Sequence, residues 1–453
     1  MLWQPLAKIM LKSRSFPIAL LILGLTAGCT AEASKSTAPQ ATASPISNQP
    51  ALSSASQSPF GLVSPTTPDA ATTRTIQQYL KKLANQGFSE RSQGVWMQSG
   101  TTLLANHQGT TPLSAASLTK VATSLAALQT FGVDHRFVTE ISSTGTIENG
   151  ILKGDLIVQG GNDPLFVWEE AIAVGNLLNQ LQIRQVTGNL IVVGRFYMNF
   201  DTDPKASGEL LKQGLNAALW SEEVKAQHLT LPAGTPRPQV TIAGDVKVAN
   251  ALPANAKPLL RHQSLPLAEL LKKMNRYSNN AMAEIIASTV GGAKIVSFKA
   301  AQAAGVPQSE VLLVNGSGLG TENRLSPRAV CAMFLAIERS LEPFKLTVAD
   351  IFTVVGQDSG VLDARKIPAL AVTKSGSLDA VSALAGALPT SQKGVVWFVV
   401  INGGNNNLEG FRSDQEALLR GLSSQWGAVQ TSPAALSINS ERSSKAPVSE
   451  RVN

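Results

Sequence analysis

Residues 112–120 have the sequence PLSAASLTK, and the apolar run VATSLAAL follows directly at 121–128. Ala, Leu and Lys favour helix formation, and the Ser114 hydroxyl is suited to cap a helix N-terminus. We therefore expect a loop that enters a helix. On that helix Ser117 and Lys120 share one face, with Cβ atoms ~5–6 Å apart. An amine at this distance can accept the proton of a serine without any histidine. Taken alone, the motif also fits a solvated serine and lysine at an ordinary helix start.

The composition and charge of the chain exclude several classes of function. It has 453 residues, 43% of them hydrophobic, which is enough for two or three domains with a sizeable core. The formal net charge is +7, and removing the three basic residues that precede residue 29 leaves +4. No Lys/Arg cluster suits a phosphate backbone, so nucleic acid is not expected as a partner. The two cysteines and four histidines lack the spacing of a zinc site, and no metal or other cofactor is predicted.

The first 29 residues have the pattern of an export signal. Lys8, Lys12 and Arg14 precede an apolar stretch at 16–28 that is too short to span a bilayer comfortably. The stretch closes on TAGC at 26–29, which resembles the lipidation site of a bacterial lipoprotein, although threonine stands where leucine is usual. We expect an exported, periplasmic protein held at a membrane through lipidated Cys29. The alternative is ordinary secretory cleavage near Ala27, which would leave Cys29 a free thiol. With Cys29 acylated, no structural disulfide is expected.

Composition and periodicity divide the rest of the chain into four parts. Residues 30–72, rich in Ala, Ser, Thr, Pro and Gln, are predicted to be a disordered tether. Residues 137–255 show strand-like alternation broken by Gly, Asn and Asp, which predicts an inserted β-rich subdomain. Helices and a hairpin at 73–136, with helices and an antiparallel meander at 256–425, predict one α+β domain. Residues 426–453 are polar and are expected to form a loose tail.

Three short motifs occur in order along the predicted α+β domain: Ser117-x-x-Lys120, Ser278-Asn-Asn280 and Lys374-Ser-Gly376. Each motif is common by itself. Ser278 and Asn280 would otherwise be helix caps, and Lys374 a solvated charge at a strand end. Their order, at a helix start, a helix-linking loop and a strand end, makes the combination specific.

On these motifs the chain resembles the penicillin-binding serine D-Ala-D-Ala peptidases. The likeness is to the carboxypeptidase/endopeptidase branch (peptidase S13-like), which carries an insertion between the first two motifs, and it covers about residues 75–425. Supporting stretches are GGNDP at 160–164, NRYSNNAMAE at 275–284 and NGSGL at 315–319, whereas residues 195–260 show little likeness. The resemblance implies an α+β, penicillin-binding/β-lactamase-like transpeptidase fold: an antiparallel five-stranded sheet flanked by helices, plus an all-helical part. The active site would lie between the sheet edge and that helical part.

The resemblance also implies roles for the motif residues. Ser117 is the expected nucleophile and Lys120 its base, with a pKa lowered by like-charge repulsion from Lys374. Ser278 would relay a proton to the leaving amine, and Asn280 would hold Lys120 and the substrate amide. The group expected to bind the terminal carboxylate of the substrate is Lys374, Ser375, Gly376 and Ser377. Backbone N–H groups of Ser117 and Ser377 would form the oxyanion hole. The NGSG run at 315–318 is expected to be a tight turn without chemistry.

The implied function is a serine-type D-Ala-D-Ala carboxypeptidase acting on peptidoglycan stem peptides, with endopeptidase action on cross-links left open. β-Lactams would acylate Ser117 as covalent inhibitors. Two alternatives stay open: a β-lactamase, for which no deacylating carboxylate can be assigned, and an inactive wall-binding lipoprotein of the same fold. A Ser-His-Asp hydrolase is disfavoured because no Gly-x-Ser-x-Gly occurs.

Overall fold

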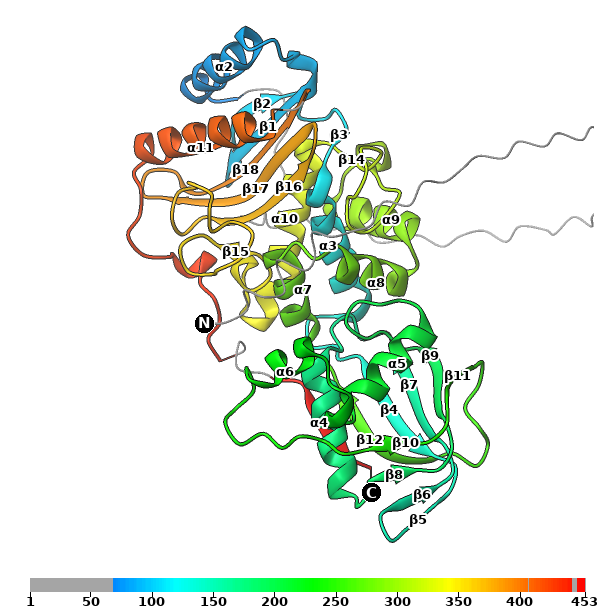
Figure 1. Cartoon of the computed structure of the whole chain (residues 1–453). Helices are drawn as coiled ribbons and strands as arrows, with labels where there is room; N and C mark the ends of the chain where they lie inside the picture. The colour runs from blue at the N-terminus through cyan, green and yellow to red at the C-terminus, as the bar shows by residue number, and fades with distance from the viewer. Residues whose placement is uncertain (1–67, 406, 442–445, 453) are drawn as a thin grey trace, which may run out of the picture. The chain divides into compact units, whose positions relative to one another are not determined.

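The computed structural model describes residues 68–405, 407–441 and 446–452 (Figure 1). The predicted signal segment, Cys29 and most of the predicted tether lie outside these residues. The first described helix, α2 (Ala70–Asn85), begins three residues before the start that we expected. The reason is the Asp69 side chain, which accepts a hydrogen bond from Thr72 N at 2.8 Å and caps the helix.

An antiparallel sheet forms the first layer of the α+β domain. Its strand order is β15-β16-β17-β18-β1-β2. The strands are β1 (Gln93–Ser99), β2 (Thr102–His107), β15 (Thr353–Val354), β16 (Val372–Leu378), β17 (Val381–Thr390) and β18 (Gly394–Gly403). Five of them are the sheet that the resemblance implied, and the two-residue β15 lies beyond β16 at one end of it. Most of β16 is therefore an open edge.

Both faces of this sheet are buried, because side chains alternate between two cores. In β18, Val396, Phe398 and Val400 join one core, while Trp397, Val399 and Ile401 join the other. The first core lies under α2 and α11 (Leu408–Gln425), and Figure 1 shows α11 across the strands. The second lies against α10 (Pro327–Leu341). All ten residues of β17 are buried as a result.

Helices make up the part that faces the β16 edge. They are α3 (Thr119–Phe131), α7 (Leu267–Arg276), α8 (Asn280–Val290) and α9 (Ala293–Ala304), which share the core of α10. A three-stranded ribbon of β3 (Leu113–Ser114), β14 (Arg324–Leu325) and β13 (Val311–Leu312) closes this part. Within the described ranges, no single helix is long and apolar enough to cross a membrane, and one bent pair, α8 with α9, passes by length and composition only.

The insertion has a core of its own, built from a mixed sheet and three helices. Its main sheet has the order β11-β9-β7-β4-β12-β19, with β7, β9 and β11 parallel, and a small second sheet has the order β10-β8-β6-β5. The strands are β4 (Val138–Ser143), β5 (Thr146–Glu148), β6 (Ile151–Lys153), β7 (Leu156–Gly161), β8 (Gln185–Val186), β9 (Leu190–Arg195), β10 (Thr241–Ile242), β11 (Val246–Ala249) and β12 (Lys257–Gln263). The helices are α4 (Trp168–Gln180), α5 (Pro204–Gly214) and α6 (Glu222–His228), so the insertion is α/β rather than mainly β.

Two expected boundaries differ from the structure. The insertion was expected to end at 255, yet β12 pairs with β4 as far as Gln263, so its sheet continues past that point. The segment 426–453, expected to be loose, contains β19 (Val448–Arg451), which pairs with β12. It also buries Leu436 against the helical core. Pairing with an open strand edge orders a polar segment without a hydrophobic run, which is why the sequence pattern missed it.

Candidate active site

The first motif lies on one turn of helix and the start of the next. Ser117 is in η2 (Ala116–Leu118), and Lys120 is in the first turn of α3. Lys120 Nζ donates to Ser117 Oγ at 3.0 Å, so the i, i+3 spacing brings the two side chains together as expected. The expected cap by Ser114 is wrong. Ser114 lies in β3, and its hydroxyl has no hydrogen-bond partner within the described residues.

The Lys120 amine is fully buried and has three hydrogen-bond acceptors. Besides Ser117 Oγ, it donates to Asn280 Oδ1 at 2.7 Å and to the Ser317 carbonyl at 2.7 Å. These match the three N–H donors of an ammonium. Burial nevertheless lowers the pKa of Lys120 to about 7, with the Glu284 carboxylate acting in the opposite direction. An amine with such a pKa can both hold and release a proton near neutral pH.

The second motif occupies the tight link between α7 and α8. Ser278 has φ of 50°, a left-handed conformation that is costly for a residue with a Cβ. Asn279 then caps α8, accepting from Met282 N at 2.9 Å, and Asn280 is the first residue of the helix. The strained link turns Ser278 toward the sheet while Asn280 faces Lys120.

The third motif lies on the edge strand β16. Lys374, also fully buried, donates to Ser278 Oγ at 2.9 Å and to the Ser375 carbonyl at 2.6 Å. Burial, and then repulsion from Lys120, lowers the pKa of Lys374 well below its usual value. We expected Lys374 to lower the pKa of Lys120. In the structure burial is the main cause at both lysines, and the like-charge repulsion acts on Lys374.

Gly376 brings β16 against the turn that carries Ser117. A Cβ at this position would lie 2.8 Å from Ala115 O and 2.9 Å from Ser117 N. Gly376 thus permits the close approach of two backbones. Ser375 and Ser377 lie on the other face of the strand, two residues apart. Ser377 Oγ accepts from Arg412 Nη2 of α11 at 2.9 Å.

The structure adds residues that the sequence reasoning did not assign. Glu284 accepts from the backbone N–H groups of Gly316 at 3.0 Å and Ser317 at 2.8 Å. Its position four residues after Asn280, on the same helix face, was an available signal. The NGSG run is a tight turn, with Gly318 at φ of 84°, but it also contributes the Ser317 carbonyl that Lys120 binds. Arg412 had no sequence signal, since it lies 35 residues beyond Ser377.

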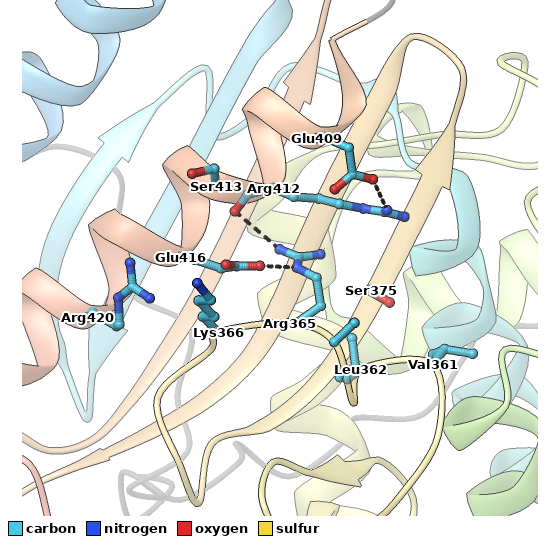
Figure 2. A pocket seen from close by; sticks show the side chains of 11 residues that line it. Val361, Leu362, Arg365, Lys366, Ser375, Glu409, Arg412, Ser413, Glu416 and Arg420 are labelled. Carbon is cyan, nitrogen blue, oxygen red and sulfur yellow. Dashed lines mark hydrogen bonds and ion pairs between the residues drawn. The ribbon is translucent and has the colours of Figure 1, made fainter.

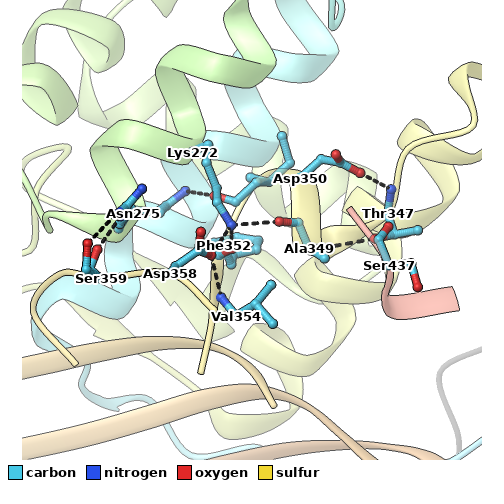
Figure 3. Close-up of polar contacts among 12 residues, drawn as sticks. Lys272, Asn275, Thr347, Ala349, Asp350, Phe352, Val354, Asp358, Ser359 and Ser437 are labelled. Carbon is cyan, nitrogen blue, oxygen red and sulfur yellow. Dashed lines mark hydrogen bonds and ion pairs between the residues drawn. The ribbon is translucent and has the colours of Figure 1, made fainter. Parts of the chain in front are cut away.

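A largely buried cation, Lys272, fixes α7, the helix that leads into Ser278. Lys272 Nζ donates to the carbonyls of Ala349 at 2.8 Å and Phe352 at 2.5 Å, and to Asp358 Oδ2 at 2.5 Å (Figure 3). Asp358 in turn accepts from Val354 N of β15 at 2.8 Å. The cluster therefore connects α7, which leads into the second motif, with β15, the strand that pairs with the strand of the third motif.

The described residues contain no group of three or more His, Cys, Asp or Glu side chains arranged to hold a metal ion. The described cysteine, Cys331, is a buried free thiol, and its Sγ donates weakly to Gln98 Oε1 at 3.7 Å. Burial raises the pKa of that thiol. Cys331 is therefore a core residue rather than a nucleophile.

The sheet, the helical part beside its edge and the three motifs define a penicillin-binding, β-lactamase-like fold. Residues 76–206 and 232–422 match the D-Ala-D-Ala carboxypeptidase 3 (S13) family, and the chain belongs to that family. It is accordingly a serine-type D-Ala-D-Ala carboxypeptidase by class. The match leaves out only 207–231 within this span, so the likeness extends through much of the region where the sequence alone showed little.

Individual relatives agree with this assignment. A carboxypeptidase of Mycobacterium tuberculosis is 27% identical over 337 residues, which is 64% of this chain and 71% of the relative. D-alanyl-D-alanine carboxypeptidase DacB of Haemophilus influenzae is 23% identical over 428 residues, 72% of this chain and 87% of the relative. Among solved structures, a predatory endopeptidase of Bdellovibrio bacteriovorus in complex with an immunity protein has a TM-score of 0.64 at 20% identity, covering 76% and 96% of the two chains. Penicillin-binding protein 4 of H. influenzae has a TM-score of 0.57 at 19% identity, covering 76% and 98%.

Proposed function

We propose that the protein hydrolyses the D-Ala-D-Ala end of peptidoglycan stem peptides through an acyl-enzyme on Ser117. One observation carries the proposal: a buried amine with a pKa of about 7, Lys120 Nζ, lies 3.0 Å from Ser117 Oγ. A general base must be within hydrogen-bond reach of the proton it removes, with a pKa near the working pH. Lys120 meets both conditions.

In the acylation step, Ser117 Oγ attacks the carbonyl carbon of the penultimate D-Ala while neutral Lys120 takes the hydroxyl proton. The oxyanion would be bound by the backbone N–H groups of Ser117 and Ser377, as the family resemblance implies. When the C–N bond breaks, the leaving D-Ala nitrogen takes a proton from Ser278 Oγ, and the Lys374 and Lys120 pair restores that proton. The products are an ester on Ser117 and free D-Ala.

In the deacylation step, water attacks the ester and gives up one proton to Lys120. The ester C–O bond breaks, Ser117 regains its proton, and the shortened peptide leaves. Asn280 would hold Lys120 and the substrate amide throughout. β-Lactams would enter by the same acylation, but their ring-opened leaving group stays attached, which favours a persistent adduct.

We further propose that the protein is exported and anchored through a lipid on Cys29, since the basic, apolar and TAGC segments at 8–29 have that pattern. Metabolic labelling with a fatty acid tests this proposal, with Cys29→Ala as the variant that should lose the label. Retention of the label by Cys29→Ala would contradict it.

The catalytic proposal is tested by intact-mass measurement of the purified protein with penicillin, wild type beside Ser117→Ala. A persistent adduct on wild type alone, with release of D-Ala from a D-Ala-D-Ala peptide, is the expected result. Rapid loss of the adduct without D-Ala release would indicate a β-lactamase. No adduct and no D-Ala release would leave an inactive protein of the same fold.

A further inference from the structure

A pocket of about 460 Å³ opens beside the third motif, between α11 and the chain that precedes β16 (Figure 2). Its wall includes Ser375 of β16, which places it at the strand proposed to hold the end of the substrate. The charged residues that line it are Arg365, Lys366, Arg412 and Arg420 against Glu409 and Glu416. The lining therefore has an excess of positive charge and suits an anionic group.

Two of the four cations differ sharply in how they are already bound. Arg365 pairs through Nε with Glu416, and both side chains are about nine-tenths buried. It also donates to Gln415 Oε1 at 3.3 Å. These interactions hold Arg365 against α11, so its side chain is already used in a structural contact. Arg412 pairs through Nη1 with Glu409, whose carboxylate is 81% exposed, and such surface pairs hold a cation only weakly.

Arg412 extends from α11 over the sheet toward β16 (Figure 2). Its Nη2 donates to Ser377 Oγ at 2.9 Å, and its Nε has no hydrogen-bond partner among the described residues. Because Ser377 Oγ accepts from Arg412, its own O–H remains directed elsewhere. A guanidinium and a hydroxyl donor thus lie side by side at the third motif.

Lys374, which the sequence motif suggested as the carboxylate anchor, is placed differently. Its side chain is buried, and its Nζ is bonded to Ser278 Oγ and to the Ser375 carbonyl. The pKa of this amine is lowered well below its usual value, which weakens any positive charge it could offer. An arginine stays protonated at any working pH and presents two parallel donors that match a carboxylate.

We propose that Arg412, beside the Ser377 hydroxyl, binds the terminal carboxylate of the peptide and makes the enzyme select chains that end in a free carboxylate. The inference rests on the proposed D-Ala-D-Ala hydrolysis. It assigns to α11 a specificity residue outside the three motifs. Lys374 then serves the proton network with Ser278 rather than the carboxylate.

The test uses two peptides that differ only at the end, D-Ala-D-Ala with a free carboxylate and the same peptide with a terminal carboxamide. Product release by wild type, Arg412→Gln, Arg412→Lys and Arg74→Gln is followed by mass spectrometry. For Arg412→Gln, kcat/KM on the acid should fall roughly 10- to 100-fold, the range for a charged hydrogen bond, and kcat/KM on the amide should stay near the wild-type value. Arg412→Lys should recover part of the loss, and Arg74→Gln, which removes an exposed cation of α2 that does not line the pocket, should behave as wild type.

An equal loss on both peptides would overturn the inference, because it would show that Arg412 only positions Ser377. No loss on the acid, or a wild type that does not prefer the acid, would overturn it as well. Failure of the proposed function itself is distinguishable, since wild type would then release neither product and form no penicillin adduct.

Discussion

The Glu284 carboxylate holds the backbone of Ser317, whose N–H donates to Glu284 Oε1 at 2.8 Å. The carbonyl of the same residue accepts from Lys120 Nζ at 2.7 Å. A carboxylate on α8 therefore orders the turn that binds the proposed base, and its charge also raises the pKa of that base against the effect of burial. Glu284 therefore influences both the position of the Lys120 amine and its pKa.

The rate of acylation should consequently depend on pH through Lys120. The neutral amine is the active form, so the rate should rise with pH through about 7, the pKa of Lys120. Glu284→Gln removes the charge that raises this pKa, and the rising limb should move to lower pH. The measurement is penicillin acylation across pH 5 to 9. The control is Glu322→Gln, which removes an exposed carboxylate from the loop that carries Ser317 and should leave the pH–rate profile unchanged. A shift of the Glu284→Gln profile to higher pH would contradict this prediction.

Gly376→Ala should impair acylation through a steric contact, not through lost chemistry. The added methyl would meet Ala115 O and Ser117 N below 3.0 Å, so β16 must move away from the turn that carries Ser117. A displacement of about 1 Å at a reacting group costs on the order of 100-fold in rate. Stopped-flow acylation by a chromogenic β-lactam measures the effect.

The matched control for that variant is Gly421→Ala in α11. A Cβ there meets nothing within 4 Å, and alanine is the better helix former. Gly421→Ala should keep wild-type acylation and gain about 0.5–1 kcal/mol of stability. A Gly376→Ala enzyme that acylates as fast as this control would show that the close approach is not needed.

The parts of the site that sequence predicted are those with short-range or strongly ordered signals. The i, i+3 spacing of Ser117 and Lys120 follows from helix geometry, and the antiparallel meander of β16–β18 follows from short strands joined by short links. Groups contributed from distant segments, such as the Arg412 side chain of α11 and the backbone carbonyl of Ser317, carry no periodic signal, because only tertiary packing brings them to the motifs. The strand β19 could not be predicted for the same reason, because this polar segment is held only by backbone pairing with the distant strand β12.

Lys272→Ala should destabilise the protein strongly. The variant leaves the largely buried Asp358 without its cation, and the carbonyls of Ala349 and Phe352 lose their donor. Breaking one side of a buried ion pair costs about 3–5 kcal/mol. Urea unfolding measures it, with Lys294→Ala on the exposed face of α9 as a control that should change stability by less than about 0.5 kcal/mol. If Lys272→Ala and Lys294→Ala had equal urea midpoints, the contacts of Lys272 would not be what holds α7 in place.

Glu338 should make the protein less stable as pH rises. It is buried in α10 near Asp350 and Glu342, and burial with these charges raises its pKa from 4.5 to about 7, despite a hydrogen bond from Val348 N at 2.8 Å. Between these two values the folded state keeps a proton that the unfolded state has released. The free energy of unfolding therefore falls across this window, by up to about 3 kcal/mol.

Glu338→Gln cannot ionise and should escape that loss. Its urea midpoint should match wild type near pH 4 and exceed it at pH 8, and the sign follows because only the charged form of Glu338 is penalised by burial. Glu209→Gln, which removes an exposed carboxylate from α5 of the insertion, should leave the pH dependence as in wild type. If wild type and Glu338→Gln had the same midpoint at pH 8, the carboxylate would have to be solvated or paired in the folded state, contrary to its position against Val348.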